Sequence, residues 1–288
     1  MTGQIRVATD TKAIIGESPV WSARRQRLLW IDIMGGLLHS YDPLSGRDTV
    51  TLVPTPAGLL AEDPQGEIIL GLGCDLARLD ADGRVTRFAR APQAEPAFRF
   101  NDGKFDKQGR LWTGLMDMEG KKGRGILFRF DPDGTWHVAD TGFDLPNGLE
   151  WSKDGETLYF TDSHKGEIYA YDFDPATGEI GNRRLFFGMD PKDGKPDGLT
   201  LDRAGHLLSV LFDGSAIARI KPNGSLERLI PLPVPRPTSC AFAGDSGAMF
   251  ITTARVGLTH DQLSCAPQSG GLFEIDYDIA AQRSRISV

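Results

Sequence analysis

A short apolar run recurs six times along this chain, and each run leads through a turn into a second strand-like segment. The runs begin at Leu28, Ile68, Leu111, Leu158, Leu207 and Met249. Successive starts lie 40, 43, 47, 49 and 42 residues apart, which is the period of one four-stranded propeller blade. Because a single blade cannot bury both of its faces, blades of this kind must pack against one another.

The composition of the runs indicates strands rather than helices. They are rich in Val, Ile, Leu and aromatic residues and are separated by Gly, Pro, Asp and Asn, which favour turns. No segment shows a long 3.6-residue periodicity, and all-β units often reach this length as one domain. The sequence therefore predicts an all-β, six-bladed β-propeller in which residues 1–288 form a single domain.

A second position recurs 10 or 11 residues before each run. It holds Ala57 or Gly58 in the second repeat, and in the other five repeats it holds Glu17, Asn101, Asn147, Asp197 and Ser239. Residues at one repeat position of a propeller share nearly the same radius and height, and the innermost strand of each blade lines the central channel. We therefore expect these side chains to form a ring near one end of the channel.

The chemistry of this ring predicts a bound cation. Carboxylates and carboxamides gathered in apolar or Gly/Pro-rich settings need a partner, because an unpaired buried charge is costly. The set contains oxygen donors and no His or Cys, which favours Ca²⁺, Mg²⁺ or Mn²⁺. Glu17 and Asp197 would neutralise a 2+ charge, and open coordination positions would suit metal-assisted hydrolysis.

Charge and composition exclude several other classes. The formal net charge is −7 with dispersed acidic residues, so no nucleic-acid partner is expected. The three cysteines lack C-x-x-C spacing, which argues against a disulfide framework or zinc knuckle. With no signal peptide and no apolar stretch of membrane-spanning length, we expect a cytoplasmic protein without a membrane partner, and we expect it to be a monomer.

Ordered motifs spanning nearly the whole chain resemble the SMP-30/gluconolactonase family, which includes regucalcin-like lactonases and bacterial aldonolactonases. The motifs are GESPVW at 16–21, RFNDGK at 99–104, LPNGLEWSKDG at 145–155, PDGLTLD at 196–202, TSCAF at 238–242 and GGLFEI at 270–275. The resemblance implies a small-molecule sugar lactone as substrate. It also implies one divalent metal cation, with Ca²⁺ the expected occupant in a crystal and Zn²⁺, Mn²⁺, Mg²⁺ or Fe²⁺ as alternatives.

Carried over motif by motif, the resemblance assigns three metal ligands, Glu17, Asn147 and Asp197. It places Arg99 and Asn101 on the sugar, together with an acidic residue after the W-x-G-x-M segment. Glu119 matches that place, and Asp117 competes with it.

The implied mechanism is hydrolysis of an aldono-1,4- or 1,5-lactone, with the cation polarising the carbonyl and Asp197 acting as the base toward water. Asp102 is the alternative base. Competing functions are hydrolysis of other lactones or organophosphates, a non-enzymatic calcium-binding or regulatory role, and a protein-binding scaffold. Taken singly, the Asn-Gly and Asp-Gly pairs are also common turn formers, and Glu119 could be a surface charge.

Overall fold

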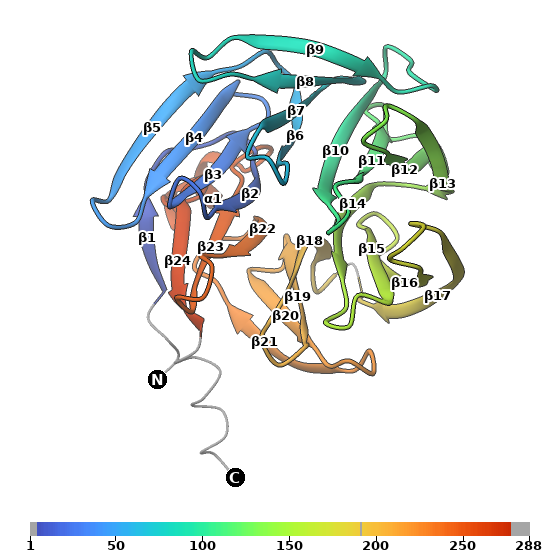
Figure 1. The fold of residues 1–288 in the computed structure, drawn as a ribbon. Helices are drawn as coiled ribbons and strands as arrows, with labels where there is room; N and C mark the ends of the chain where they lie inside the picture. The colour runs from blue at the N-terminus through green and yellow to red at the C-terminus, as the bar shows by residue number, and fades with distance from the viewer. Residues whose placement is uncertain (1–4, 191, 278–288) are drawn as a thin grey trace.

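The computed structural model describes residues 5–190 and 192–277, and there it arranges 24 strands in six four-stranded antiparallel sheets around a common axis (Figure 1). The predicted six-bladed β-propeller is thereby confirmed. Each apolar run forms the second strand of a blade, and each segment before it forms the innermost strand.

The first three blades follow the chain from the axis outward. Blade one comprises β2 (Gly16–Ser22), β3 (Arg27–Asp32), β4 (Leu37–Asp42) and β5 (Arg47–Leu52). Blade two comprises β6 (Ala57–Glu62), β7 (Ile68–Leu72), β8 (Asp75–Leu79) and β9 (Val85–Arg90). Blade three comprises β10 (Phe98–Phe105), β11 (Leu111–Asp117), β12 (Gly125–Phe130) and β13 (Trp136–Phe143).

Blades four and five repeat the same order, and blade six is completed from the start of the chain. Blade four comprises β14 (Pro146–Trp151), β15 (Thr157–Asp162), β16 (Glu167–Phe173) and β17 (Ile180–Gly188). Blade five comprises β18 (Lys195–Leu201), β19 (Leu207–Phe212), β20 (Ala216–Ile220) and β21 (Leu226–Pro231). Blade six comprises β22 (Pro237–Phe242), β23 (Ala248–Thr253), β24 (Leu272–Asp276) and β1 (Ile5–Thr9).

Two sets of contacts close the ring. The innermost strands contact one another in the order β2, β6, β10, β14, β18 and β22, and β22 returns to β2. On the outside, β1 pairs antiparallel with β24, with Ile5 opposite Ile275 (Figure 1). The N-terminal strand therefore joins the last blade to the start of the chain and covers an otherwise open sheet edge.

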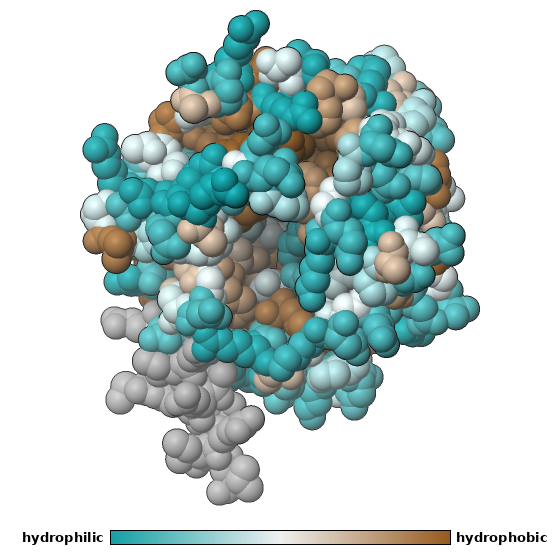
Figure 2. Space-filling model, viewed as in Figure 1, coloured by the Kyte–Doolittle hydropathy of each residue, from teal (hydrophilic) through white to brown (hydrophobic). Residues whose placement is uncertain are grey.

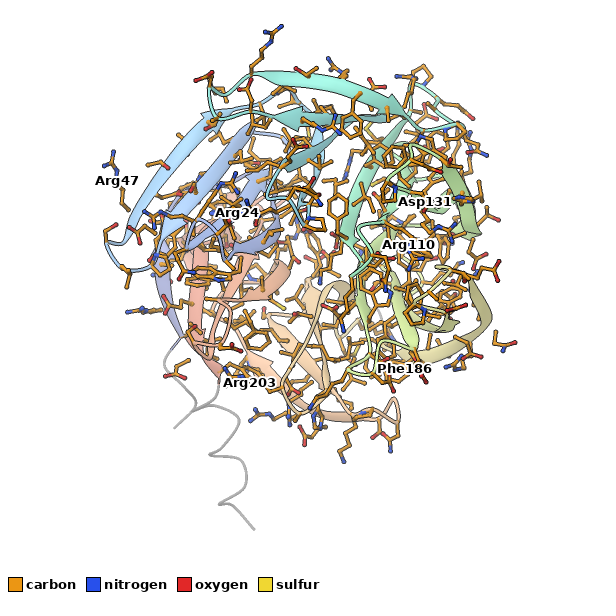
Figure 3. All side chains as sticks on the ribbon, in the orientation of Figure 1. Arg24, Arg47, Arg110, Asp131, Phe186 and Arg203 are labelled. Atoms are coloured by element: carbon orange, nitrogen blue, oxygen red, sulfur yellow. The ribbon has the colours of Figure 1, made fainter. Side chains whose placement is uncertain are left out.

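The core lies between neighbouring blades. Trp112 and Leu127 of blade three pack with Leu149 and Phe160 of blade four, and all four are buried; full burial of such a side chain contributes about 1.5–3 kcal/mol. Side chains fill the space between the sheets (Figure 3), and the face of the molecule seen in Figure 2 is largely hydrophilic. Packing of this kind sets the spacing of the innermost strands.

Each innermost strand loses regular pairing with its neighbour at the same place near its start. The register shifts fall between Glu17 and Val20, Ala57 and Leu59, Phe100 and Gly103, Pro146 and Leu149, Pro196 and Leu199, and Pro237 and Ser239. A β-bulge changes the direction of nearby side chains. The ring position found in the sequence therefore coincides with a bulge in every blade.

Glycines at these bulges allow neighbouring blades to approach closely. A Cβ on Gly148 would lie 2.4 Å from the Asp197 carbonyl oxygen, and one on Gly198 would lie 2.1 Å from Ser239 Oγ. Both glycines are strand residues in β14 and β18. The alternative interpretation of these Asn-Gly and Asp-Gly pairs as turn formers is therefore wrong.

The loop between β23 and β24 carries the short helix α1 (His260–Cys265), which begins with a capping box formed by Thr259 and Gln262. None of the helical structure in residues 5–190 and 192–277 has the length and apolar character that a membrane-spanning helix needs. All three cysteines are free: Cys74 and Cys240 are buried, and Cys265 is exposed.

Candidate functional site

Four polar side chains predicted from the repeat lie on the innermost strands at the bulges. Glu17 is on β2, Asn101 on β10, Asn147 on β14 and Asp197 on β18, and each is only 4–7% exposed. Polar groups buried to this degree require hydrogen bonds, opposite charges or a ligand.

The carboxyl of Glu17 lies in an environment that disfavours its charged form. Burial and the negative charge of Asp102 raise the pKa of Glu17 to about 8, although the Ser18 N–H and the positive charge of Arg99 oppose the rise. Ser18 N donates to Glu17 Oε2 at 2.7 Å. Ser18 has a φ of 47°, so the bulge carries a non-glycine residue in the left-handed region.

Asp197 and Asp102 share this environment. Burial, followed by the charges of Glu17 and Asp102, raises the pKa of Asp197 well above its ordinary value. Burial also raises the pKa of Asp102 to about 6, although the charge of Lys104 and the Gly103 N–H oppose it. The protein groups around these three carboxyls therefore leave a deficit of positive charge.

Arg99 supplies part of that positive charge. Its Nη1 donates to the Phe100 carbonyl oxygen at 2.8 Å, and burial lowers its pKa to about 10 despite the charges of Glu17 and Asp197. A Cβ on Gly58 would lie 2.6 Å from Arg99 Nη1. The absence of a side chain at the ring position of blade two thus leaves room for this guanidinium.

The two amide side chains are oriented by hydrogen bonds. Asn147 Nδ2 donates to Ser163 Oγ at 3.0 Å, and Asn101 Nδ2 donates to the Pro146 carbonyl oxygen at 2.9 Å. Asn147 Oδ1 and Asp197 Oδ1 are buried without a hydrogen-bond partner among the residues that the structure describes. Unpartnered buried acceptors of this kind are suited to a cation.

The residues present fit a hard divalent ion. Glu17 and Asp197 supply carboxylate oxygens and Asn147 an amide oxygen, which are the ligand types that Ca²⁺ and Mg²⁺ prefer. Within the described ranges there is no group of three or more His, Cys, Asp or Glu side chains arranged to hold a metal. The fit therefore depends on the amide of Asn147 as the third oxygen donor.

Glu119 lies outside this buried group. It is exposed on the loop between β11 and β12, where its Oε2 lies 2.5 Å from Lys121 Nζ. Its competitor Asp117 is buried, pairs with Arg124 at 2.6 Å and accepts the Glu119 N–H at 2.8 Å. Asp117 therefore orders the loop, and a role for Glu119 toward a ligand stays a prediction.

Sequence reasoning missed two features of the site. Ser163, which orients Asn147, comes from the turn between β15 and β16 and is buried. Lys104 and Glu150 form an ion pair at 2.9 Å between β10 and β14. The sequence signal for the pair was limited to the opposite charges of Lys104 and Glu150 on two inner strands, and Lys104 shares its strand with Arg99 and Asp102.

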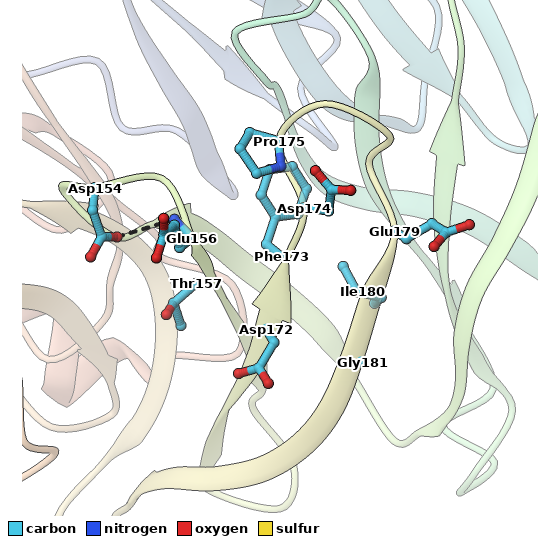
Figure 4. A pocket seen from close by; sticks show the side chains of 10 residues that line it. All are labelled: Asp154, Glu156, Thr157, Asp172, Phe173, Asp174, Pro175, Glu179, Ile180 and Gly181. Atoms are coloured by element: carbon cyan, nitrogen blue, oxygen red, sulfur yellow. Dashed lines mark hydrogen bonds between the residues drawn. The ribbon is translucent and has the colours of Figure 1, made fainter.

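A pocket of about 670 Å³ elsewhere on the molecule offers a rival location (Figure 4). It lies at the turns of blade four and is lined by Asp154, Glu156, Asp172, Asp174 and Glu179, among others. These turns follow β14 and β16, whereas Asn147 is near the start of β14. Several of its carboxylates cap their own turns; Asp154 Oδ1, for example, accepts the Glu156 N–H at 3.1 Å. The unpartnered oxygens therefore favour the axial site.

A family model described as the SMP-30/gluconolactonase/LRE-like region matches residues 15–255. The chain belongs to this family. Regucalcin of Xenopus laevis is 36% identical over 269 residues, covering 91% of this chain and 90% of the relative. The pentonolactonase XacC of Haloferax volcanii is 36% identical over 252 residues, covering 85% of this chain and 83% of the relative.

The solved structures place this member of the SMP-30/gluconolactonase/LRE-like family on the same fold as its relatives. The crystal structure of a calcium-binding protein, regucalcin, from Agrobacterium tumefaciens superposes with a TM-score of 0.90 at 28% identity. The match covers 95% of this chain and 93% of that one. The region matched by the family model, residues 15–255, contains all four of the buried site residues on the innermost strands.

Proposed function

We propose that this protein hydrolyses the lactone of a sugar acid to the open aldonic acid with the help of one bound divalent cation. The observation that carries the proposal is the pair of buried, unpartnered oxygens, Asn147 Oδ1 and Asp197 Oδ1, beside the carboxyl of Glu17. The relative XacC, a pentonolactonase, supports a lactone as the substrate class. The Agrobacterium relative, a calcium-binding regucalcin, supports the cation.

Glu17, Asn147 and Asp197 would hold the cation, and Ca²⁺ is the ion that we expect first. When bound, a divalent ion supplies Lewis-acid polarisation of a carbonyl oxygen. Two carboxylates and an amide leave coordination positions for water and for substrate.

Asp197 is the base in this proposal. Its Oδ1, which accepts no hydrogen bond from the described residues, would face the cation, and the second carboxylate oxygen would take a proton from the attacking water. Water adds to the lactone carbonyl carbon, the bond from that carbon to the ring oxygen breaks, and the ring oxygen receives the proton. The product is one hydroxy acid with no separate leaving group.

Arg99 and Asn101 would bind the sugar. The Arg99 guanidinium presents several donors in a plane, which suits neighbouring hydroxyl or ring oxygens. The Asn101 Nδ2 donates one of its two N–H groups to Pro146, which leaves the second N–H and Oδ1 for substrate hydroxyls. Glu119 would join them only if the β11–β12 loop brought its carboxylate from the surface to the sugar.

A panel assay tests this function. Full-length protein is treated with EDTA, desalted and supplied with Ca²⁺, Mg²⁺, Mn²⁺ or Zn²⁺ singly, and acid release from five- and six-membered aldonolactones is followed above the spontaneous rate. We expect turnover that chelation abolishes and added metal restores. An apolar lactone and an organophosphate ester serve as comparison substrates.

Two results would contradict the proposal. Turnover by metal-free protein at the untreated rate would remove the cation from the reaction. Tight ion binding with no turnover of any lactone would favour the alternative of a calcium-binding, non-enzymatic propeller.

A further inference from the structure

Lys104 places an ammonium group at the inner side of three successive blades. From β10, its Nζ donates to Glu150 Oε2 on β14 at 2.9 Å and to the Leu199 carbonyl oxygen on β18 at 2.8 Å. Strand β14 lies between β10 and β18 in the ring. The side chain must therefore cross the axial side of β14 to reach β18.

The charged side chains of the inner strands can be counted because all six strands are described. When the first and last residue of each strand are left out, four carboxylates and two cations remain: Glu17, Asp102, Glu150, Asp197, Arg99 and Lys104. In their ionised forms these groups carry a formal charge of −2. Burial raises the pKa of the nearby Cys240 thiol to about 12, so this neutral group adds nothing.

One divalent ion would balance this charge. We propose that Lys104 is the resident counter-charge that sets the ionic charge accepted by the axial site. With Lys104 in place a 2+ ion completes neutrality; without it the same groups carry −3 and favour a 3+ ion. The inference rests on the proposed cation site and goes beyond it, because it assigns the selectivity for ionic charge to a residue that is not a ligand.

Electrostatics gives the expected size of the effect. Loss of the Lys104 charge removes a repulsion that grows with the charge of the bound ion. A trivalent ion therefore gains one more unit of charge–charge interaction than a divalent ion does. Two unit charges roughly 10 Å apart in a medium with an effective dielectric constant of about 20 interact strongly enough to change an equilibrium ratio on the order of tenfold. A role limited to bracing the three strands would weaken both ions together and leave their ratio unchanged.

The experiment measures Ca²⁺ and Tb³⁺ dissociation constants by calorimetry on full-length protein freed of metal. Lys104→Met removes the charge and keeps an unbranched side chain, whereas Lys104→Arg keeps the charge. Lys153→Met is the matched control, because Lys153 Nζ also bonds a carbonyl of the next blade, Arg203 O at 3.3 Å, but at an exposed turn.

We expect Lys104→Met to raise the preference for Tb³⁺ over Ca²⁺ about tenfold, with Lys104→Arg and Lys153→Met within about twofold of wild type. Glu150→Gln removes a negative charge from the same group, so it should shift the preference in the opposite direction, and it provides the test if Lys104→Met does not fold.

An unchanged ratio of the Tb³⁺ and Ca²⁺ dissociation constants in folded Lys104→Met, or a shift of the same sign in Glu150→Gln, overturns this inference and leaves the proposed cation site standing. A wild-type protein that binds neither ion overturns the proposed cation site and the inference with it.

Discussion

Asn147 Nδ2 donates to Ser163 Oγ at 3.0 Å, and this bond turns the amide so that Oδ1 is left buried without a partner. Ser163 itself is held by a bond from its N–H to the Leu145 carbonyl oxygen at 3.0 Å. The turn between β15 and β16 therefore helps to set which atom of Asn147 is offered to a ligand, together with a hydrogen bond between the side chains of Asn147 and Asp197. The orientation of a ligating side chain commonly depends on such an outer partner.

Ser163→Ala should weaken the binding of Ca²⁺ about 10- to 100-fold, because the amide of Asn147 would no longer be held with its oxygen inward. Calorimetric titration of metal-free protein measures the change. Ser22→Ala is the control, since Ser22 Oγ is also buried and hydrogen-bonded, to Glu62 Oε1 at 2.8 Å, but near the other end of β2. Equal losses in both variants would mean that the effect is one of general stability.

Asp197→Asn should lower kcat at least ~100-fold, the lower end of what a positioned general base contributes. The amide keeps an oxygen for the ion, so the fold and some ion binding should survive. Steady-state kinetics test this prediction, and circular dichroism checks that the variant is folded. If the variant bound metal and hydrolysed lactone at nearly the wild-type rate, the base would have to be sought at Asp102.

Arg99→Ala should raise KM and lower kcat, because the guanidinium positions the sugar and its contact can strengthen as the carbonyl carbon becomes tetrahedral. Arg99→Lys should not restore activity, since an ammonium lacks the planar fork of donors. Steady-state kinetics over several aldonolactones measure both parameters. Unchanged KM and kcat in Arg99→Ala would remove this residue from the substrate site.

Asp102 should make metal-free protein less stable as the pH rises. Its pKa is raised to about 6 in the fold from an ordinary 3.8, so between these values the folded state holds a proton that the unfolded state has lost, and stability falls with increasing pH. Comparing the Tm of wild type and Asp102→Asn isolates this group. The wild type should lose stability relative to the variant from about pH 4 to pH 6; a constant difference would contradict the assignment.

Gly198→Ala should destabilise the protein by about 1–3 kcal/mol through overpacking, because the new Cβ would lie 2.1 Å from Ser239 Oγ and 2.7 Å from Ser239 Cα. It should also displace the adjacent Asp197 and lower activity. Gly188→Ala is the control, since a Cβ there meets no atom within 4 Å. Chemical denaturation measures both, and equal stabilities would show that the blades can move apart without cost.

The repeat in the sequence determined the architecture of this protein. Six apolar runs such as those at Leu28 and Leu207 became the second strands of six blades, because strand propensity and spacing are local properties of the chain. The constant offset to Glu17 and Asp197 also placed these residues on innermost strands. One repeat position becomes one radius in a propeller, so the common location followed without any knowledge of contacts.

The tertiary structure alone decided how the site is completed. The bulges and the hydrogen bond from Asn147 to Ser163 join different segments of one blade. The approach of Arg99 to Gly58 and the hydrogen bond from Lys104 to Leu199 join different blades. Glu119 is a further example of what the sequence did not reveal, because its motif position gave no sign that it lies exposed beside Lys121. Such contacts depend on how bulged strands and neighbouring sheets meet, and a periodic pattern of apolar residues carries no information about that meeting.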